Sequence, residues 1–118
     1  MTRVRFEEVN WHDMAEIPYR ASRLMKTLGN PKAYALVQIL LEDRALTVQE
    51  IADNLHRSQQ AVSIMLRSLR DLEVVRYQRR EKNVIYALKD PAALRAGMKH
   101  MEEVVRRATE TAPRGTPR

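Results

Sequence analysis

The sequence predicts a mainly α-helical fold that carries one small β-hairpin. Apolar residues recur at spacings of three and four over most of the chain, which is typical of amphipathic helices. After Leu72 the spacing changes to two, which is typical of strands. Residues 1–13 show neither pattern, so we expect an N-terminal arm there, then a folded domain over residues 14–108 and a flexible tail over residues 109–118.

The first two helices are delimited by a Gly-Asn-Pro sequence at residues 29–31. Glycine and asparagine commonly end helices, and proline is favoured in the first turn of a helix. The first helix is expected from Met14, with Asp13 as its N-cap, and the second is expected to reach about Asp43. The apolar residues of the first helix form one stripe, which comprises Ile17, Ala21, Leu24, Met25 and Leu28.

A short third helix and a longer fourth helix are expected next, separated by a tight turn at residues 56–57. Thr47 caps the third helix, and Glu50 three residues later completes a capping box. Residues 44–46 connect this helix to the preceding one. Ser58 caps the fourth helix, whose apolar residues are Ala61, Val62, Met65, Leu66 and Leu69. The short helix, the turn and the second helix match the plan of a helix-turn-helix.

Two strand-like runs follow the fourth helix. The first begins at Val75 and the second covers residues 83–88, with residues 81–82 between them, which predicts a β-hairpin. The turn lacks the Asn-Gly pair that would fix its geometry, so the register stays open at this stage. Asp90 then opens a last helix that is expected to reach about Ala108.

Positive charge is concentrated in one part of the chain. The net charge is +6, and residues 57–89 hold eight basic and three acidic side chains. A clustered basic excess is expected of a surface that binds phosphates, although composition alone is equally compatible with a charge that keeps the protein soluble. No apolar run is long enough for a membrane span, and the first residues lack the apolar stretch of a secretory signal, so we expect a cytoplasmic protein.

Composition also bears on which chemistry is available. The chain has no cysteine, which excludes disulfides, thiolate metal sites and thiol redox sensing. With three glycines and no motif for nucleophilic catalysis, we expect neither an enzyme nor a cofactor. His100 and Glu103 have a spacing compatible with metal binding, but an ordinary pair on a helix surface is the favoured interpretation. Packing is likewise favoured over a ligand pocket for Met25, Met65, Met98 and Met101.

The fourth helix is the candidate for reading DNA bases. Because its apolar residues must face inward, its polar residues are forced outward. Glutamine pairs with adenine and arginine with guanine, isoleucine can touch a thymine methyl group, and free N–H groups at a helix start bind phosphate. A plain solvated helix face is the alternative. The residues expected to contact DNA are Ser58, Gln59, Gln60, Ser63, Ile64 and Arg67.

A second set of candidate contacts lies on the hairpin and beside the fourth helix. Folding requires no cluster of cations at a β-turn, so these side chains are expected to grip the DNA backbone. They are Arg57, Arg76, Arg79, Arg80 and Lys82, of which the last four are expected to gather at the tip of the hairpin. A recognition helix beside a cationic hairpin is the arrangement of a winged helix-turn-helix, so double-stranded DNA is the expected partner.

Four segments resemble the ArsR-type family of winged helix-turn-helix regulators. They are residues 28–41, which begin Leu-Gly-Asn-Pro-Lys, residues 47–52, residues 57–63, which read Arg-Ser-Gln-Gln-Ala-Val-Ser, and residues 69–88. The resemblance implies a homodimeric repressor that pairs through its first and last helices. The apolar stripes of those helices agree, because one small domain cannot cover both. The expected dimer residues are Ile17, Leu24, Leu94, Met98, Met101 and Val105.

The sequence departs from that family where the family has glycine. His56 replaces the glycine of the helix-turn-helix turn, so Asn54 or His56 is expected to adopt the left-handed backbone conformation. The glycine before the first strand of the hairpin is also missing, with Val74 near its place. The tip of the hairpin has Glu-Lys-Asn at residues 81–83, where glycine is common.

The sequence therefore predicts a sequence-specific DNA-binding transcriptional regulator, a repressor that binds a two-fold related operator as a homodimer. Two alternatives stay open. A winged helix can serve as a protein- or RNA-binding module in a transcription assembly, and the same fold can sense a metal or a small molecule. The sequence names no inducer, operator or target gene.

Overall fold

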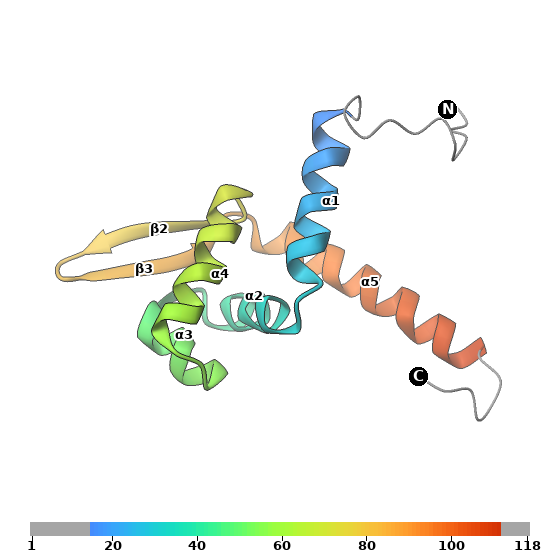
Figure 1. The fold of residues 1–118 in the computed structure, drawn as a ribbon. Helices are drawn as coiled ribbons and strands as arrows, with labels where there is room; N and C mark the ends of the chain where they lie inside the picture. The colour runs from blue at the N-terminus through green and yellow to red at the C-terminus, as the bar shows by residue number, and fades with distance from the viewer. Residues whose placement is uncertain (1–14, 112–118) are drawn as a thin grey trace.

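The computed structural model describes residues 15–111, which form five helices and a three-stranded antiparallel sheet (Figure 1). The expected class, mainly α with a β-hairpin, is confirmed. The predicted arm over residues 1–13 lies outside the described residues. In chain order the elements are α1 (Glu16–Leu28), α2 (Pro31–Asp43), β1 (Ala45–Thr47), α3 (Val48–Leu55), α4 (Gln59–Asp71), β2 (Val75–Arg80), β3 (Asn83–Leu88) and α5 (Pro91–Thr111).

Helix α5 runs further than the sequence predicts. It continues past Ala108 to Thr111, so the first residues of the predicted tail are helical, and residues 112–118 lie outside the described part of the chain. Its start is held by the Asp90 carboxylate, which accepts a hydrogen bond from the N–H of Ala93 at 3.0 Å. Figure 1 shows most of α5 projecting away from the other helices.

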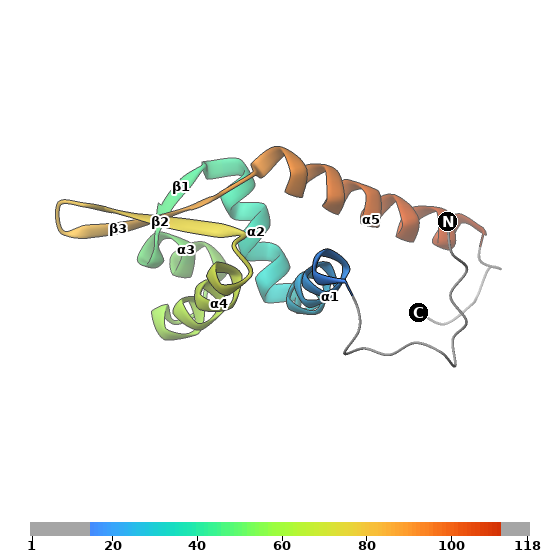
Figure 2. The ribbon, with the colours of Figure 1, turned by 90° about the horizontal axis from the view of Figure 1, so that it is seen from above.

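Helix α2 is the centre of the hydrophobic core. Its residues Leu36, Val37 and Leu40 are almost fully buried. Figure 2 shows α2 between α3 and α4 on one side and α1 and α5 on the other. Each large apolar side chain gains about 1.5–3 kcal/mol by leaving water, so this packing fixes how α3 and α4 lie on α2. From α3 and α4 the same cluster contains Ile51, Val62, Leu66 and Leu69.

The helix starts are held by the side chains that the sequence predicts. The Thr47 hydroxyl accepts a hydrogen bond from the N–H of Glu50 (3.2 Å), and the Glu50 carboxylate accepts one from the N–H of Thr47 (2.9 Å), which confirms the capping box. The Ser58 hydroxyl accepts from a backbone N–H in the first turn of α4 at 3.1 Å. Helix α1 differs, because its N-cap is Ala15, without a side-chain bond, and Asp13 lies outside the described residues.

The hairpin forms as predicted, and the structure fixes its register. Strands β2 and β3 pair antiparallel from Val75 opposite Leu88 to Arg80 opposite Asn83. Residues 81–82 therefore form a two-residue turn, the tightest connection between two strands.

Strand β1 corrects the expectation of a plain connection over residues 44–46. It pairs antiparallel with β3, from Ala45 opposite Ala87 to Thr47 opposite Ile85. A strand of three residues is too short to show an alternating pattern, so the sequence carries no strand signal there. The pairing joins the start of α3 to the hairpin and so braces the hairpin along one edge.

Among residues 15–111, four residues other than glycine have a positive φ, which costs a residue with a side chain roughly 1–2 kcal/mol. In the turn of the helix-turn-helix, His56 is the residue with the left-handed conformation, and Asn54 is helical within α3. Before the hairpin, the residue with a positive φ is Glu73. It comes one residue before Val74, which the sequence placed near the missing glycine and which is buried. All four lie at junctions between elements, and they are Arg44 (φ 44°), His56 (φ 54°), Glu73 (φ 61°) and Glu81 (φ 53°).

The left-handed residue Glu73 ends α4 in a Schellman motif. Its N–H donates to the carbonyl oxygen of Arg70 (2.8 Å), and the N–H of Val74 donates to the carbonyl oxygen of Leu69 (2.9 Å). Val74 and Leu69 are both buried, which supplies the apolar contact that accompanies this motif. The end of α4 is therefore fixed although the position that favours glycine is occupied by glutamate.

The side chain of Glu73 ties α4 to two other helices. Its carboxylate accepts a hydrogen bond from the guanidinium of Arg20 in α1 and lies 3.5 Å from the Nζ atom of Lys89, just before α5. The hydrogen bond from Arg20, and then the charge of Lys89, hold the pKa of the Glu73 carboxyl below its usual value. Glu73 and Lys89 are exposed and Arg20 is partly exposed, so this network orients the elements more than it stabilises them.

Replacing His56 by glycine should stabilise the fold. Glycine adopts the left-handed conformation without steric cost, so we expect His56→Gly to raise the free energy of unfolding by about 1 kcal/mol in chemical denaturation. Asn54→Gly is the matched control, since Asn54 is helical and glycine there should cost about 1 kcal/mol. A less stable His56→Gly protein would show that the imidazole makes contacts that outweigh the strain.

The Glu73 ion pairs should make the free energy of unfolding depend on pH in the acidic range. A carboxyl with a lowered pKa in the folded chain contributes stability above its unfolded pKa, and the contribution is lost as pH falls through the folded pKa. We expect Glu73→Gln to lower the thermal unfolding midpoint slightly at neutral pH and to match the parent chain in acid, once the Glu73 carboxyl is protonated in the folded chain. Glu81→Gln, at the other left-handed glutamate, is the control. An equal difference at both pH values would contradict the ion-pair explanation.

Candidate nucleic-acid interface

Helix α4 exposes the polar face that the sequence predicts. Val62, Leu66 and Leu69 are buried in the core, which turns the opposite side of the helix to solvent. Ile64 is 60% exposed and so is free to meet an apolar group such as a thymine methyl. The face therefore offers hydrogen-bonding groups and one apolar group together. All of the predicted base-contacting residues are exposed on it, namely Ser58, Gln59, Gln60, Ser63, Ile64 and Arg67.

The start of α4 lies beside the start of α2. A hollow of about 430 Å³ is lined by Asn30 and Lys32 from the start of α2 and by His56, Arg57 and Ser58 from the helix-turn-helix. The structure thus adds Lys32 to the predicted cation Arg57 at this place. The sequence gives no direct signal for Lys32, because it is separated from the turn by a whole helix and becomes a neighbour only when the helices fold together.

The hairpin carries its cations in two places rather than one. Arg79 and Arg80 end β2, and Lys82 lies in the turn, as predicted. Arg76 instead pairs with Ala87 near the root of the hairpin, so the expectation that four cations gather at the tip is wrong for Arg76. The error arises because sequence distance from the turn is hard to judge until the register is known.

The two candidate surfaces lie next to each other. Figures 1 and 2 show the hairpin projecting beside α4, at the end of the molecule away from most of α5. Alternation along β2 places Val75, Tyr77 and Arg79 on one face of the hairpin, and Val75 is buried where that face meets the core. Arg76 and Arg80 lie on the opposite face.

An aromatic contact joins α4 to the hairpin. The guanidinium carbon of Arg70, in the last turn of α4, lies 4.2 Å from the centre of the Tyr77 ring in β2. The Tyr77 ring in turn lies 6.0 Å from the ring of Tyr86 in β3, with the planes tilted by 38°. Sequence reasoning missed this contact. Its only signal is the pair of tyrosines at opposite positions of the two strand-like runs, and that becomes visible once the register is fixed.

The predicted dimer residues separate into exposed and buried groups. Ile17 of α1 is 73% exposed, and Met101 and Val105 of α5 are also exposed. Leu24 and Leu94 are partly buried and pack against the core. Met98 is only 5% exposed and belongs to the core of its own chain, so the structure does not offer it to a partner. Apolar residues on the same helices that the prediction omitted are exposed, namely Tyr19, Met25 and Val104.

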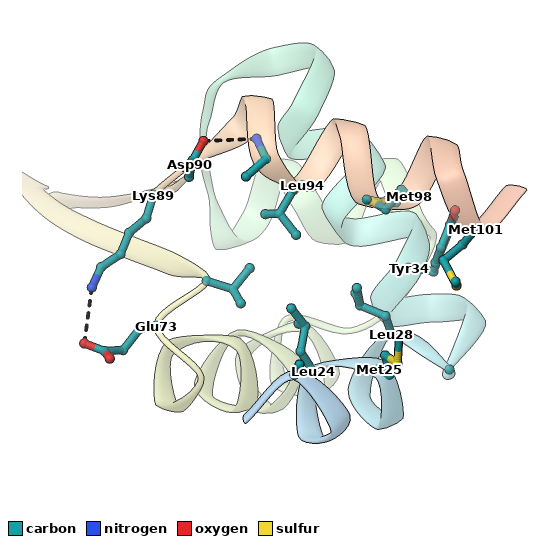
Figure 3. Close-up of a pocket in the computed structure, with 15 residues that line it drawn as sticks. Leu24, Met25, Leu28, Tyr34, Glu73, Lys89, Asp90, Leu94, Met98 and Met101 are labelled. Carbon is teal, nitrogen blue, oxygen red and sulfur yellow. Dashed lines mark hydrogen bonds and ion pairs between the residues drawn. The ribbon is translucent and has the colours of Figure 1, made fainter. Parts of the chain in front are cut away.

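An apolar groove of about 570 Å³ runs between α1 and α5 (Figure 3). Leu24, Met25 and Leu28 of α1 face Leu94 and Met101 of α5 across it. At one end the lining becomes charged, where the Glu73–Lys89 ion pair and the capping Asp90 lie.

A hydrogen bond between side chains of α2 and α5 lies beside this groove. The hydroxyl of Tyr34 donates a hydrogen bond to the Glu102 carboxylate, and this bond is the main reason that the pKa of Tyr34 is raised to about 12. Together with the buried side chain of Met98, it holds the middle of α5 against the rest of the domain.

His100 and Glu103 do not form the core of a metal site among the described residues. The Glu103 carboxylate accepts hydrogen bonds from Arg106 (3.2 Å) and Arg107 (3.1 Å) on the same helix. Within residues 15–111 no three histidine or acidic side chains cluster closely enough to hold a metal ion. In the same residues, no helix combines the length and the apolar character that crossing a bilayer requires.

No protein-family model matches the sequence, and no curated protein matches it. Solved structures do. HlyU from Vibrio cholerae N16961 is 27% identical over 75% of this chain and 97% of its own, with a TM-score of 0.64. The transcriptional repressor BigR from Xylella fastidiosa is 26% identical over 79% of this chain and 96% of its own, with a TM-score of 0.62.

A third structure resembles this chain in fold alone. Mb0332 from Mycobacterium bovis is 18% identical over 77% of this chain and 89% of its own, with a TM-score of 0.66. It is described as a homodimeric winged helix-turn-helix DNA-binding domain and a possible ArsR-family transcriptional regulator. These likenesses confirm the resemblance drawn from the sequence: this chain has the winged helix-turn-helix fold of the ArsR-type transcriptional regulators.

Proposed function

We propose that this protein regulates transcription by binding duplex DNA with a preference for particular sequences. The observation that supports the proposal most is the exposed polar face of α4 beside an exposed cationic hairpin, with the hydrophobic core behind both. A winged helix-turn-helix divides its work in this way, because the helix reads base edges in the major groove and the wing binds phosphates.

The residues of the interface take distinct roles in this proposal. Gln59 and Gln60 are suited to adenine and Arg67 to guanine, since each can form paired hydrogen bonds with that base. Ile64 can contact a thymine methyl group, and Ser58 can bind phosphate with the free N–H groups of the first turn. The cations that bind the DNA backbone are Lys32, Arg57, Arg79, Arg80 and Lys82, with Arg76 nearer the root of the wing.

The proposed regulator acts as a homodimer through α1 and α5. Both helices expose large apolar side chains, among them Ile17, Met101 and Val105, and a second copy is the partner that would cover them symmetrically. Two recognition helices then meet successive major grooves about 34 Å apart, which requires a two-fold related operator. A dimer seated on such a site blocks access to the DNA, so the proposed direction is repression, in the cytoplasm and without catalysis.

Selection of bound fragments from random duplex DNA tests the proposed function. We expect enrichment of a short repeated half-site with two-fold symmetry, and a binding constant that falls steeply with salt because phosphate contacts release counterions. Equal binding to all duplexes, or binding to RNA in preference to duplex DNA, would contradict the proposal and favour a different partner for the same surface.

Arg67→Ala should reduce sequence preference. Removing a paired contact to guanine costs about 1–3 kcal/mol at the specific site, which corresponds to roughly five- to 150-fold in affinity, and random DNA should be affected much less. Arg79→Ala is the comparison, because loss of a phosphate contact should weaken specific and random DNA alike and reduce the salt slope by about one. Fluorescence anisotropy measures both. Unchanged sequence preference in Arg67→Ala would show that another face of α4 reads the bases.

Val105→Glu should separate the dimer without unfolding the domain. Val105 is exposed on α5, so a carboxylate there costs little in the free chain but would be buried against the apolar surface of a second copy. Sedimentation equilibrium is expected to show a monomer and a loss of operator binding. Ala96→Glu, exposed on the opposite side of α5, is the matched control and should stay dimeric. A dimeric Val105→Glu protein would place the dimer interface elsewhere.

A further inference from the structure

We infer that Tyr77 is a positioning residue for DNA binding, because its ring fixes the wing relative to the recognition helix. The inference rests on the proposed function. Tyr77 is 51% exposed on a strand whose other outer residues are also exposed, so burial in the core does not account for an aromatic residue there. The contact with Arg70 does, because it joins β2 to α4 directly.

Tyr77 is the third member of a row that crosses the sheet. Tyr77 lies opposite Tyr86, and Tyr86 lies opposite Leu46 of β1. Residues directly opposite each other in antiparallel strands project to the same face, so these three side chains form one continuous row. The row begins in the core, where Leu46 is buried, and ends at the guanidinium of Arg70 above the Tyr77 ring.

This row lies one residue pair before the last level at which a neighbouring strand holds the hairpin. On one edge, β1 pairs with β3 only as far as Ile85. On the other edge, no strand of residues 15–111 pairs with β2, and Arg70 contacts β2 over the face of the Tyr77 ring. Beyond this level the hairpin continues to its turn with the cations Arg79, Arg80 and Lys82. A small rotation about the row therefore moves the phosphate-binding cations by a larger amount.

The contact between Arg70 and Tyr77 is of a kind that persists in water. A planar guanidinium stacks on the face of an aromatic ring, whereas the ammonium group of lysine is a compact charge that stays strongly hydrated. The backbone of Arg70 is fixed as well, since its carbonyl oxygen accepts the hydrogen bond that ends α4. Both ends of the contact are therefore placed by the fold before any DNA is present.

Binding measurements with paired variants test the inference. We expect Tyr77→Ala to weaken binding to specific and random duplexes alike by roughly three- to tenfold, and Tyr77→Phe, which keeps the ring, to bind like the parent chain. The deciding measurement is a double-mutant cycle. Arg80→Ala should cost less in the Tyr77→Ala background than in the parent, because a wing that is not held no longer delivers its cations.

Three binding outcomes would overturn the inference. Tyr77→Ala could bind like the parent, Arg80→Ala could cost the same in both backgrounds, or Arg70→Gln could weaken binding while Tyr77→Ala does not. The last result would mean that Arg70 contacts DNA itself. Thermal unfolding of each variant is measured in parallel, and a Tyr77→Ala chain that unfolds at assay temperature is replaced by Tyr77→Leu.

A second measurement needs no DNA and so separates this inference from the proposed function. The chain has no cysteine, so spin labels can be placed at Asp53→Cys in α3 and Lys82→Cys in the wing turn. In labelled chain diluted with unlabelled chain, we expect one narrow distance distribution for the parent and a broader one for Tyr77→Ala. Equal distributions would overturn the inference, whether or not the protein binds DNA.

Discussion

The burial of one side of α4 in the hydrophobic core determines what this protein can present to a partner. Val62, Leu66 and Leu69 lie on one side of the helix, and each is at most 1% exposed. A helix repeats every 3.6 residues, so fixing these three leaves Gln60 and Arg67 no direction but outward. The exposed polar face is thus a consequence of core packing, and the cap at the start of α4 sets where that face begins.

The chain turns sharply at both ends of α4, and neither turn contains glycine. His56 precedes the helix and Glu73 follows it, and both adopt the left-handed conformation. The surrounding structure supplies the compensation. At the far end, Val74 and Leu69 are buried together, while the Glu73 side chain binds Arg20 and Lys89. Strain of this kind persists where neighbouring contacts determine the backbone, and here those contacts also orient the recognition helix.

Features with a local cause could be predicted from the sequence. The capping box of Thr47 and Glu50, the cap at Ser58 and the inward side of α4 depend on residues within one or two turns of each other, and all are present. Features that depend on register or tertiary packing could not. The position of Arg76 requires the hairpin register, and strand β1 forms only because β3 lies beside it.

The predicted dimer residues also depend on tertiary packing that the sequence pattern does not determine. A helical stripe identifies which residues face inward, but not whether the surface that they meet belongs to the same chain or to a second one. Met98 and Met101 lie on the same stripe of α5, yet Met98 is buried in the core and Met101 is exposed. The difference depends on where α5 projects beyond the domain. That point is set by the tertiary structure and cannot be predicted from the spacing of apolar residues.

The groove between α1 and α5 connects the surface proposed for dimerisation to the end of the helix proposed to read DNA. Its charged end is formed by Glu73 and Lys89, and Glu73 is the residue whose backbone ends α4. Arg20, which donates to Glu73, belongs to α1, so a shift of α1 against α5 acts directly on the last turn of the recognition helix. That turn also carries Arg70, whose guanidinium holds the wing through Tyr77. Helix α1, the end of α4 and the wing are therefore linked in series by side-chain contacts, which join the surface proposed for dimerisation to both surfaces proposed for DNA.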